Sequence, residues 1–334
     1  MKKYTYVYLG TCSDYYKYIR EQLSNKTNRV VVSNYVLNNM NFAQRFLYKV
    51  HTSRITNFFF NLPLKGIWSK FFLSKQTRNI ISKRENVCFC IHGLEYIYAK
   101  NGLIKYLRHN YPNSKIVLIL TDIVAFYNTF YKGFKIDNVK QEFDFVFSFN
   151  PIDVCKYNLC EFRPCVIDYD SNETDFEFDV FFIGRNKNRL NEVCEVARYL
   201  TSKGYKLFFY LVNVPLNSQI HIDGLHYGGI IPYSEVINYV KKSKCILNIY
   251  QKNSDGITLR DNEAIGLNKV LITNGEAILS SCFFTDEKII RLDNLKDELY
   301  KIDHFNQNHE WNGKKEYSIE NFYNWFDEVL NTKG

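Results

Sequence analysis

Short apolar segments that end in polar residues recur along this chain and alternate with segments of helical periodicity. The clearest apolar segments are residues 87–91, 115–120, 245–249 and 270–272. Runs this short and this apolar are typical of strands buried on both faces of a sheet, and helices between them favour parallel pairing. The sequence therefore predicts an α/β chain with parallel sheets, in which the polar ends of the strands lie along one edge.

The length of the chain predicts two domains. A chain of 334 residues exceeds one ordinary core and fits two domains of roughly 150 residues each. Residues 168–179 contain six acidic and no basic residues, and we place the domain boundary at this change in composition. The predicted parts are a Rossmann-like domain, a linker, a second such domain and a C-terminal helix packing at the domain junction, over residues 1–165, 166–178, 179–316 and 317–334.

Composition indicates a globular protein of a reducing compartment. Hydrophobic residues make up 46% and charged residues 23%, which excludes intrinsic disorder. The nine cysteines include no CxxC pair, which favours buried free thiols over disulfides or a zinc site. The first residues lack the long apolar run of a signal peptide, and no segment has the roughly 20 apolar residues of a membrane span. We expect a cytoplasmic protein that at most touches a membrane surface.

One segment of the first domain is strongly basic. Residues 24–84 contain eleven Lys or Arg and no acidic residue, and aromatic residues are interleaved with them. Three interpretations are open: a surface that lies on anionic lipid, a nucleic-acid patch, or ordinary helices whose aromatics face the core. Of these we expect the anionic membrane surface as a partner, and no nucleic acid.

Residues 253–274 combine the features of an anion site with two carboxylates. A glycine-bearing loop leads into a short helix, and Asp255 and Glu263 are separated by seven residues with Arg260 between them. Free backbone N–H groups at a helix start suit a diphosphate, and a carboxylate further along the helix can reach ribose hydroxyls. The alternative is an ordinary turn in which Asp255 caps the helix and Glu263 pairs with Lys269.

The second half of the chain resembles the donor-binding domain of GT-B glycosyltransferases, closest in pattern to family 4 and its capsule and lipopolysaccharide relatives. The motifs are Gly184-Arg185 after a strand, Gly229-Ile-Ile-Pro-Tyr-Ser-Glu235 before a helix, and Asp255-x7-Glu263 followed by Ala-Ile-Gly. They cover roughly residues 178–290. The resemblance implies two Rossmann-like domains with a cleft between them and a C-terminal helix crossing back, with residues 1–165 binding the acceptor and 179–316 the donor.

The resemblance also implies roles for individual residues. Glu263 would bind the ribose hydroxyls, Arg185 with Lys187 or Arg189 the diphosphate, and Asp255 would lie near the donor sugar, where the family carries Glu. Thr258 and Leu259 would give backbone N–H groups to the phosphates. The implied catalytic residues are Asp255, Arg185 and His92, and the implied donor-binding residues are Gly184, Arg185, Lys187, Tyr233, Gly256, Thr258, Leu259, Arg260 and Glu263.

The resemblance implies chemistry without a metal or other cofactor, because Arg185 and helix-end N–H groups would carry the leaving-group charge. The one Asp-x-Asp motif, Asp168-Tyr-Asp170, opens the acidic linker, and we interpret it as a solvated boundary. Family 4 enzymes retain the anomeric configuration. An inverting enzyme would need a base from the first domain, with Asp14, His92, Glu95 and Asp122 as acceptor-side candidates.

The resemblance and the basic aromatic segment together suggest a metal-independent transferase. It would move a sugar from a nucleotide sugar to a lipid-linked glycan acceptor in bacterial surface polysaccharide assembly. Two rivals are a GT-B-like enzyme of another class, such as a nucleotide-sugar epimerase or a phosphorylase, and a non-catalytic scaffold that binds nucleotide sugars. Donor hydrolysis without acceptor would argue against the scaffold.

Overall fold

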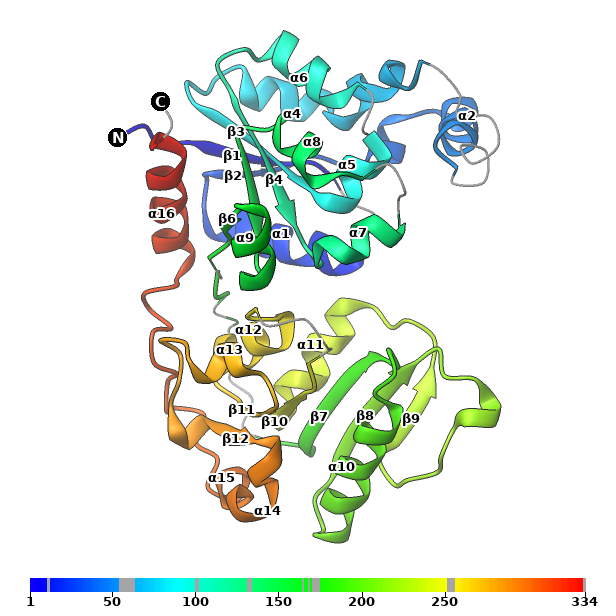
Figure 1. Ribbon diagram of the computed structural model, residues 1–334, viewed down its shortest axis with the longest axis vertical. Helices are drawn as coiled ribbons and strands as arrows, with labels where there is room; N and C mark the ends of the chain where they lie inside the picture. Colours follow the sequence, from blue (N-terminus) through cyan, green and yellow to red (C-terminus); the bar gives the residue numbers. More distant parts are fainter. Residues whose placement is uncertain are drawn as a thin grey trace. The chain divides into compact units, whose positions relative to one another are not determined.

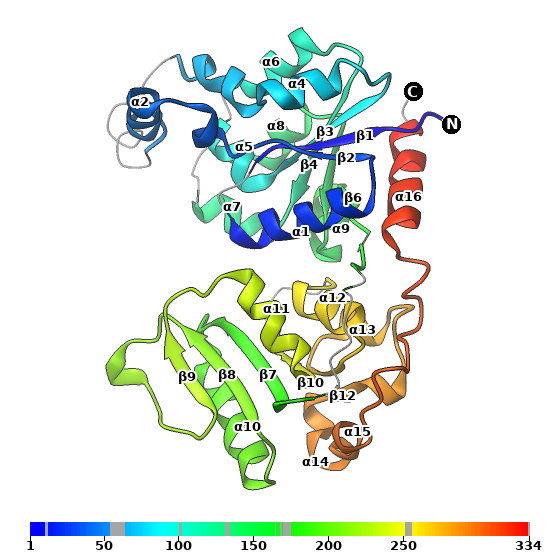
Figure 2. The ribbon, with the colours of Figure 1, turned by 180° about the vertical axis from the view of Figure 1, so that it is seen from behind.

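The computed structural model describes residues 1–10, 13–53, 64–99, 102–130, 134–163, 165–167, 169, 175–250 and 256–332. The chain divides into two compact units. Unit 1 comprises Met1–Arg163 and Ile319–Gly334, and unit 2 comprises Pro164–Ser318. Each unit contains a parallel sheet with helices on both faces (Figures 1 and 2), so the prediction of an α/β chain with two parallel sheets is confirmed.

In unit 1 the described residues form a six-stranded sheet with strand order β2-β1-β3-β4-β5-β6. The strands are β1 (Thr5–Tyr8), β2 (Val30–Val32), β3 (Val87–His92), β4 (Lys115–Leu120), β5 (Phe145–Ser148) and β6 (Cys160–Glu161). The helices are α1 (Asp14–Lys26), η1 (Val36–Asn39), α2 (Phe42–Thr52), η2 (Lys65–Phe72), α4 (Lys75–Ile81), α5 (Gly93–Ala99), α6 (Leu103–Asn110), α7 (Val124–Phe130), α8 (Ile136–Lys140), α9 (Pro151–Tyr157) and α16 (Ile319–Asn331).

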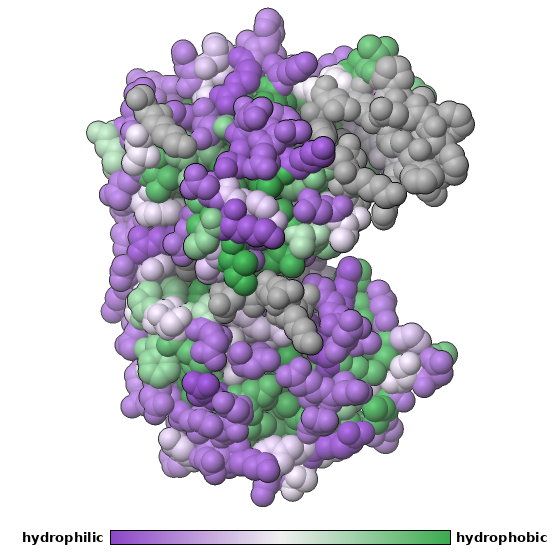
Figure 3. Space-filling view, in the orientation of Figure 1, coloured by the Kyte–Doolittle hydropathy of each residue, from purple (hydrophilic) through white to green (hydrophobic). Residues whose placement is uncertain are grey.

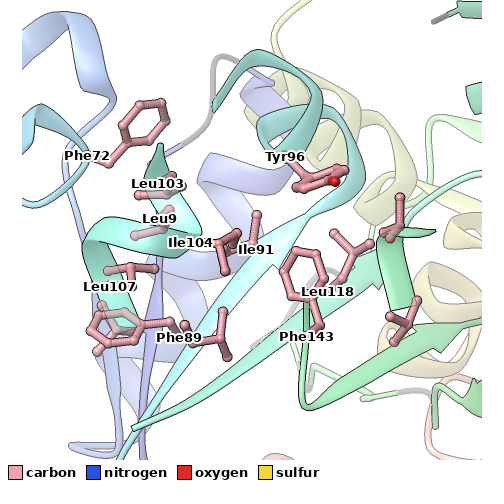
Figure 4. Close-up of a cluster of buried hydrophobic side chains, with 14 of the residues drawn as sticks. Leu9, Phe72, Phe89, Ile91, Tyr96, Leu103, Ile104, Leu107, Leu118 and Phe143 are labelled. Carbon is pink, nitrogen blue, oxygen red and sulfur yellow. The ribbon is translucent and has the colours of Figure 1, made fainter. Parts of the chain in front are cut away.

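The core of unit 1 lies against both faces of the central strands. Strand β3 is buried along its whole length, as a strand covered by helices on both faces requires. Figure 4 shows Phe89 and Ile91 of this strand among Leu103 and Leu107 of α6. The eight cysteines in the described part of the chain are free thiols; four are buried, as expected, whereas Cys155 and Cys282 are exposed.

The C-terminal helix α16 completes unit 1 beside its first strand (Figures 1 and 2). The carboxylate of Asp327 is fully buried there and accepts hydrogen bonds from the Tyr4 backbone N–H at 3.0 Å and the Tyr6 hydroxyl at 2.9 Å. It also forms an ion pair with Arg29. A buried carboxylate is tolerated because it is paired and hydrogen-bonded, so these contacts fix α16 to unit 1. That the helix also packs at a domain junction stays a prediction.

In unit 2 the described residues form a six-stranded sheet with strand order β12-β11-β10-β7-β8-β9. The strands are β7 (Phe178–Arg185), β8 (Leu207–Val212), β9 (Leu225–Gly228), β10 (Ser243–Asn248), β11 (Val270–Thr273) and β12 (Ile289–Arg291). The helices are α10 (Leu190–Ser202), η3 (Leu216–Ser218), α11 (Tyr233–Lys241), α12 (Leu259–Gly266), α13 (Glu276–Leu279), η4 (Asp286–Lys288), η5 (Leu292–Asn294), α14 (Leu295–Glu298) and α15 (Tyr300–Asp303).

Three strands, β6, β9 and β12, lack the apolar run by which a buried strand is expected from sequence, and each lies at an edge of its sheet. Residues 226–232 are expected to form a bend, whereas residues 225–228 form β9 at one edge of the sheet. Its exposed His226 and partly exposed Gly228 break the apolar pattern, because an edge strand is covered on fewer sides. Strands β6 and β12 contain only two and three residues, too few to show a period.

The basic segment 24–84 contributes both core and surface. Trp68 and Phe72 of η2 are buried, and Phe71 packs partly buried against the same core, which agrees with the interpretation as ordinary helices. Phe58, Phe59 and Phe60 lie outside the described residues. Helix α2 differs, because four large apolar side chains on it are exposed: Phe42, Phe46, Leu47 and Val50.

Helix α2 contacts η2 through Tyr48 and His51. Its buried Tyr48 packs edge-on against Trp68, and the Trp68 indole N–H donates to His51 Nδ1 at 2.8 Å. On the face of the molecule that Figure 3 shows, hydrophobic residues lie in small groups among hydrophilic ones. Among the described residues, no helix has the length and apolar character needed to cross a membrane.

Candidate functional site

The strand order of unit 2 reverses between β7 and β10, which lie side by side in the sheet. In open parallel sheets, ligands bind beyond the carboxyl ends of the strands at such a reversal. The segments that follow these two strand ends are the turn 186–189, which leads into α10, and the approach to α12. The sequence-predicted donor residues belong to these segments and to the start of α11.

A buried carboxylate fixes the start of α12. Asp261 is fully buried, and its Oδ2 accepts from the Thr258 backbone N–H at 2.6 Å and the Thr258 hydroxyl at 2.7 Å. The Tyr250 hydroxyl donates to the same oxygen, and the Asn248 amide donates to Oδ1 at 2.8 Å. Burial raises the pKa of Asp261, while these hydrogen bonds act in the opposite direction.

The Asp261 network changes one expected role. The backbone N–H of Thr258, expected to contact phosphate, already donates to Asp261. Four donors to one buried carboxylate also join the end of β10 to the start of α12, since Asn248 is the last residue of that strand. Asp261 therefore organises the approach to α12, a role that the sequence analysis does not assign.

Glu263 lies two residues further along α12 with its side chain only 1% exposed. Its Oε1 accepts from the hydroxyl of Tyr233, the first residue of α11, at 2.7 Å. Its Oε2 forms an ion pair with Arg260, one turn earlier on the same helix. The alternative pair with Lys269 is not formed, because the Lys269 ammonium donates to the backbone carbonyl of Lys241 at 2.8 Å.

Arg260 connects Glu263 to the end of β7. Its guanidinium also donates to the carbonyl of Ile183 at 3.3 Å, and it lies 5.7 Å from the ring centroid of Phe181. The side chain is 17% exposed, so Arg260 is not a surface helix residue. A carboxylate held by one hydroxyl and one guanidinium is oriented before any ligand arrives, which is what a ribose-binding group requires.

The turn after β7 is shaped by backbone geometry and by Arg189. Lys187 and Asn188 have φ angles of 40° and 63°. The Asn186 side chain accepts from the Leu190 backbone N–H at 3.1 Å, which caps α10. A Cβ on Gly184 would lie 2.4 Å from a nitrogen of Arg189, so a larger residue at position 184 would require the guanidinium to shift.

Arg189 is the more buried cation of this turn. Its guanidinium donates to the carbonyl of Ile249, just after β10, and to that of Arg185 at 3.3 Å. Burial, together with the nearby charge of Arg260, lowers the pKa of Arg189 to about 10. Two cations thus lie close together beside the β7–β10 reversal, which favours an anionic ligand there.

For the remaining donor-binding candidates the structure gives burial but fewer contacts. Arg185 and Lys187 are exposed, Gly256 is buried, and Leu259 is the partly buried first residue of α12. Asp255, Asp168 and Asp170 lie outside the described residues. In the described part of the chain, no group of three His, Cys, Asp or Glu side chains is arranged to hold a metal ion.

The acceptor-side candidates follow strands of unit 1. His92 ends β3, Glu95 lies in the first turn of α5, Asp122 follows β4, and Asp14 begins α1 after β1. His92 and Glu95 are buried, whereas Asp14 is exposed. The Asp122 carboxylate accepts from the Ile123 backbone N–H at 2.9 Å. The topology thus brings them to one edge of the sheet, as the strand-end pattern predicts.

His92 is held by a residue that sequence reasoning missed. Arg20 of α1, 2% exposed, donates from Nη2 to His92 Nδ1 at 2.8 Å and from Nη1 to the Leu9 carbonyl. Burial and the charge of Arg20 lower the pKa of His92 well below its ordinary value of 6.5. An imidazole in this state is neutral at pH 7, and its Nδ1 is already occupied by the Arg20 guanidinium.

This lowered pKa predicts loss of stability in acid. The unfolded chain takes up a proton on His92 near pH 6.5 while the folded chain does not, so the free energy of unfolding falls as the pH decreases through this range. Between pH 7.5 and 5.5 we expect the wild type to lose about 1.4 kcal/mol more than His92→Asn. Urea unfolding at the two pH values measures this, and equal losses in both proteins would contradict it.

The residues missed by the sequence analysis had different kinds of signal. Thr258 and Asp261 form the S/T-x-x-D/E spacing typical of a helix start, which was available in the sequence. Arg20 had no such signal, because it is 72 residues from His92 and meets it only through the sheet.

Comparison with known protein families gives one match, to a part of unit 2. Residues 199–313 match the model of a family described as glycosyl transferase-like. This segment contains Tyr233, Asp261 and Glu263. A search of curated protein sequences gives no match.

Solved structures of similar fold are glycosyltransferases. An α-glucosyltransferase in complex with UDP and mismatched DNA has a TM-score of 0.57 at 10% identity, covering 99% of this chain and 100% of that one. An α-glucosyltransferase with UDP-glucose and abasic-site DNA has a TM-score of 0.53 at 10% identity, covering 97% and 92%. The α,α-trehalose 6-phosphate synthase of Burkholderia multivorans has a TM-score of 0.50 at 7% identity, covering 99% of each chain.

These comparisons correct one expectation. Nucleic acid was expected not to be a partner, yet α-glucosyltransferases of this fold are solved with DNA and UDP, so that exclusion is wrong. The physical reason is that a net charge of +8 and an acid-free segment of 61 residues, from Ser24 to Arg84, suit any polyanion and not lipid alone. The fold is that of GT-B enzymes, and together with the matched segment it supports a glycosyltransferase.

Proposed function

We propose that this protein transfers a sugar from a nucleotide-sugar donor that binds at the β7–β10 reversal of unit 2. The observation that carries the proposal is Glu263, a buried carboxylate oriented by Tyr233 and Arg260 beside that reversal. Structural neighbours with bound UDP or UDP-glucose support the donor class. The rival interpretation as a non-catalytic scaffold keeps the donor site and lacks only the transfer.

In this proposal Glu263 binds the ribose hydroxyls with lone pairs that Tyr233 and Arg260 leave available. Arg185, the last residue of β7, and Lys187, on the turn that follows, are exposed and contact the diphosphate, while Arg189 is held by the carbonyl of Ile249. The backbone N–H of Leu259, at the start of α12, faces the same anion. The Thr258 N–H is not part of this set.

We further propose that transfer needs no metal and retains the anomeric configuration. The support for metal independence is the group of cations beside the strand reversal, Arg185, Lys187 and Arg189, which can neutralise the departing diphosphate. Retention rests on the resemblance to family 4 alone.

For the acceptor we propose a glycan, lipid-linked and presented at an anionic membrane surface during assembly of a bacterial surface polysaccharide. The support is α2, whose exposed Phe42, Phe46, Leu47 and Val50 accompany Arg45 and Lys49 in a segment without acidic residues. Exposed apolar side chains with cations beside them are typical of helices that lie in a membrane interface.

DNA is a second candidate acceptor, because a specific observation favours it. Two of the structural neighbours are α-glucosyltransferases solved together with DNA, and their match extends over nearly the whole of both chains. The basic segment of unit 1 suits a phosphate backbone as well as a lipid surface.

Donor turnover with defined acceptors tests the proposed function. The full chain is incubated with a panel of nucleotide sugars, and release of nucleoside diphosphate is measured alone, with anionic vesicles carrying lipid-linked glycan, and with duplex DNA. We expect one donor to be turned over faster with the vesicles than alone. Acceleration by DNA instead would transfer the acceptor assignment to DNA. Donor binding without turnover under any condition would favour the scaffold.

Arg185→Ala is expected to lower kcat about 10-fold with a smaller change in KM, because charge on the leaving diphosphate is greatest in the transition state. Steady-state kinetics with the accepted donor measure this. The matched control is Arg198→Ala, which removes an exposed cation from α10. Asn186→Ala is not a neutral control, because Asn186 caps α10. An equal loss of kcat in Arg185→Ala and Arg198→Ala would show that Arg185 does not stabilise the leaving diphosphate.

A further inference from the structure

The sheet of unit 1 has its own reversal of strand order, between β1 and β3. Arg20 lies at this place and joins the two strand ends. Its guanidinium donates to the carbonyl of Leu9, just after β1, and to Nδ1 of His92, the last residue of β3. Both side chains are buried, with 2% and 7% of their surface exposed. A cation and an imidazole are thus enclosed where a parallel sheet ordinarily binds its ligand.

The contact determines which ring nitrogen of His92 carries the proton. A guanidinium has only N–H donors, so Nδ1 of His92 must accept and must be unprotonated. A neutral imidazole with an unprotonated Nδ1 carries its single proton on Nε2. Among the described residues, the contact with Arg20 is the one hydrogen bond that the imidazole makes.

Aromatic and acidic side chains surround the pair of His92 and Arg20. The ring centroid of Tyr16 of α1 lies 4.7 Å from the imidazole, and that of Tyr8 of β1 lies 6.1 Å away, both edge-on. Burial lowers the pKa of Arg20, while the charge of Glu95 of α5 acts in the opposite direction and favours the charged guanidinium. On the next residue, Gly93, a Cβ would lie 2.5 Å from the Tyr127 hydroxyl of α7, so the backbone here is closely enclosed.

We propose that Arg20 is a positioning residue that holds His92 as a neutral Nε2–H donor, which offers a hydrogen bond to an oxygen of the acceptor bound by unit 1. The Nε2 atom cannot then remove a proton, so His92 is not the general base. The nature of the ligand, a hydroxyl-bearing acceptor, rests on the proposed function. The tautomer and the role of Arg20 do not.

The tautomer is tested directly by nitrogen NMR on the full chain with labelled histidine. The chain has seven His residues, and the spectrum of His92→Asn identifies the His92 signals. We expect an unprotonated Nδ1 and a protonated Nε2 from pH 8 to pH 5.5. In Arg20→Met the pKa of the imidazole should rise, because the positive charge of Arg20 is gone, but it should stay below 6.5, because burial, the larger cause of the lowered pKa, remains. A protonated Nδ1 in the wild type, or titration near 6.5 with Arg20 intact, would overturn the proposal.

Two variants that keep Arg20 test the donor role even if Arg20→Met does not fold. His92→Asn keeps an acceptor for Arg20 and removes the Nε2 donor, whereas His92→Gln places an amide N–H near the Nε2 position. We expect kcat/KM for transfer to fall about 10- to 100-fold in His92→Asn and clearly less in His92→Gln. Donor binding should stay within about twofold in both, because it occurs on unit 2.

The outcomes separate this inference from the proposed function. Full transfer activity in His92→Asn would overturn the donor role. The transfer rate of the wild type could instead fall as one group takes up a proton near pH 6.5, and His92→Gln could lose this pH dependence. That result would show that His92 is a general base and would also overturn the donor role. Failure of the wild type to bind any nucleotide sugar would sink the proposed function, while the NMR result would still decide the tautomer.

Discussion

Glu263→Gln is expected to lower the affinity for the nucleotide-sugar donor about 100-fold while the protein stays folded. Hydrogen bonds to a charged group contribute about 1.5–3 kcal/mol each, and a neutral amide loses most of this toward two ribose hydroxyls. Gln keeps the volume of the side chain and a carbonyl oxygen for Tyr233, so it is preferred to Ala in this buried position. Titration calorimetry with the donor that the wild type binds measures the change.

The control for Glu263→Gln is Glu195→Gln on α10, which removes an exposed carboxylate of the same unit. Its donor affinity should equal that of the wild type. If Glu263→Gln also binds the donor as the wild type does, Glu263 is not a ribose ligand and the proposed donor site is wrong.

Arg260→Met is expected to lower the free energy of unfolding by about 3–5 kcal/mol, because it leaves the buried carboxylate of Glu263 without its cation. Loss of the contact with the Ile183 carbonyl adds to the effect. Urea unfolding measures the change. Donor affinity should fall as well, since Tyr233 alone no longer fixes the direction of the carboxylate.

The double variant Arg260→Met/Glu263→Gln separates an unpaired charge from lost packing. Arg260→Met leaves the carboxylate of Glu263 without a cation, and Glu263→Gln removes that negative charge. The double variant should therefore recover most of the lost free energy of unfolding, as in a double-mutant cycle on interacting residues. A double variant no more stable than Arg260→Met would show that the loss comes from packing around Phe181 and not from the ion pair. An Arg260→Met protein as stable as the wild type would contradict the structural role of the pair.

The fold could be predicted from sequence where burial leaves a clear pattern. Strands β3, β4, β10 and β11 are covered on both faces, so their segments are apolar and bounded by polar residues. Strand β9 could not be found in this way, because an edge strand that ends at Gly228 and is followed by Gly229 resembles a turn. A strand is recognised in a sequence by the apolar residues that other elements cover. Edge strands are covered least and therefore have the weakest apolar pattern.

The candidate site was predictable where contacts are local in the chain. The pair of Arg260 and Glu263 has the i, i+3 spacing of one helix face, and the Thr258–Asp261 contact has the spacing of a helix start. Lys269 was the wrong partner for Glu263 because α12 ends at Gly266 and the chain takes a positive φ of 54° at Asn268. This turn directs Lys269 to the end of α11 instead.

Contacts across the sheet were beyond sequence reasoning. Arg20 meets His92 because β1 and β3 pair, and Tyr233 meets Glu263 because the start of α11 faces α12. Neither of these two contacts joins residues at a characteristic spacing in the sequence. For this reason the structure alone reveals the contact on which we base a donor role for His92, and the contact that holds the carboxylate of Glu263.

Hydrogen exchange with and without nucleotide sugar tests the central claim most directly, because it locates the ligand on the chain. We predict that the donor slows exchange in peptides covering residues 183–190 and 256–266, and that Glu263→Gln loses this protection at the same donor concentration. Protection absent from both segments, or confined to unit 1 at a saturating donor concentration, would contradict a donor site at the β7–β10 reversal.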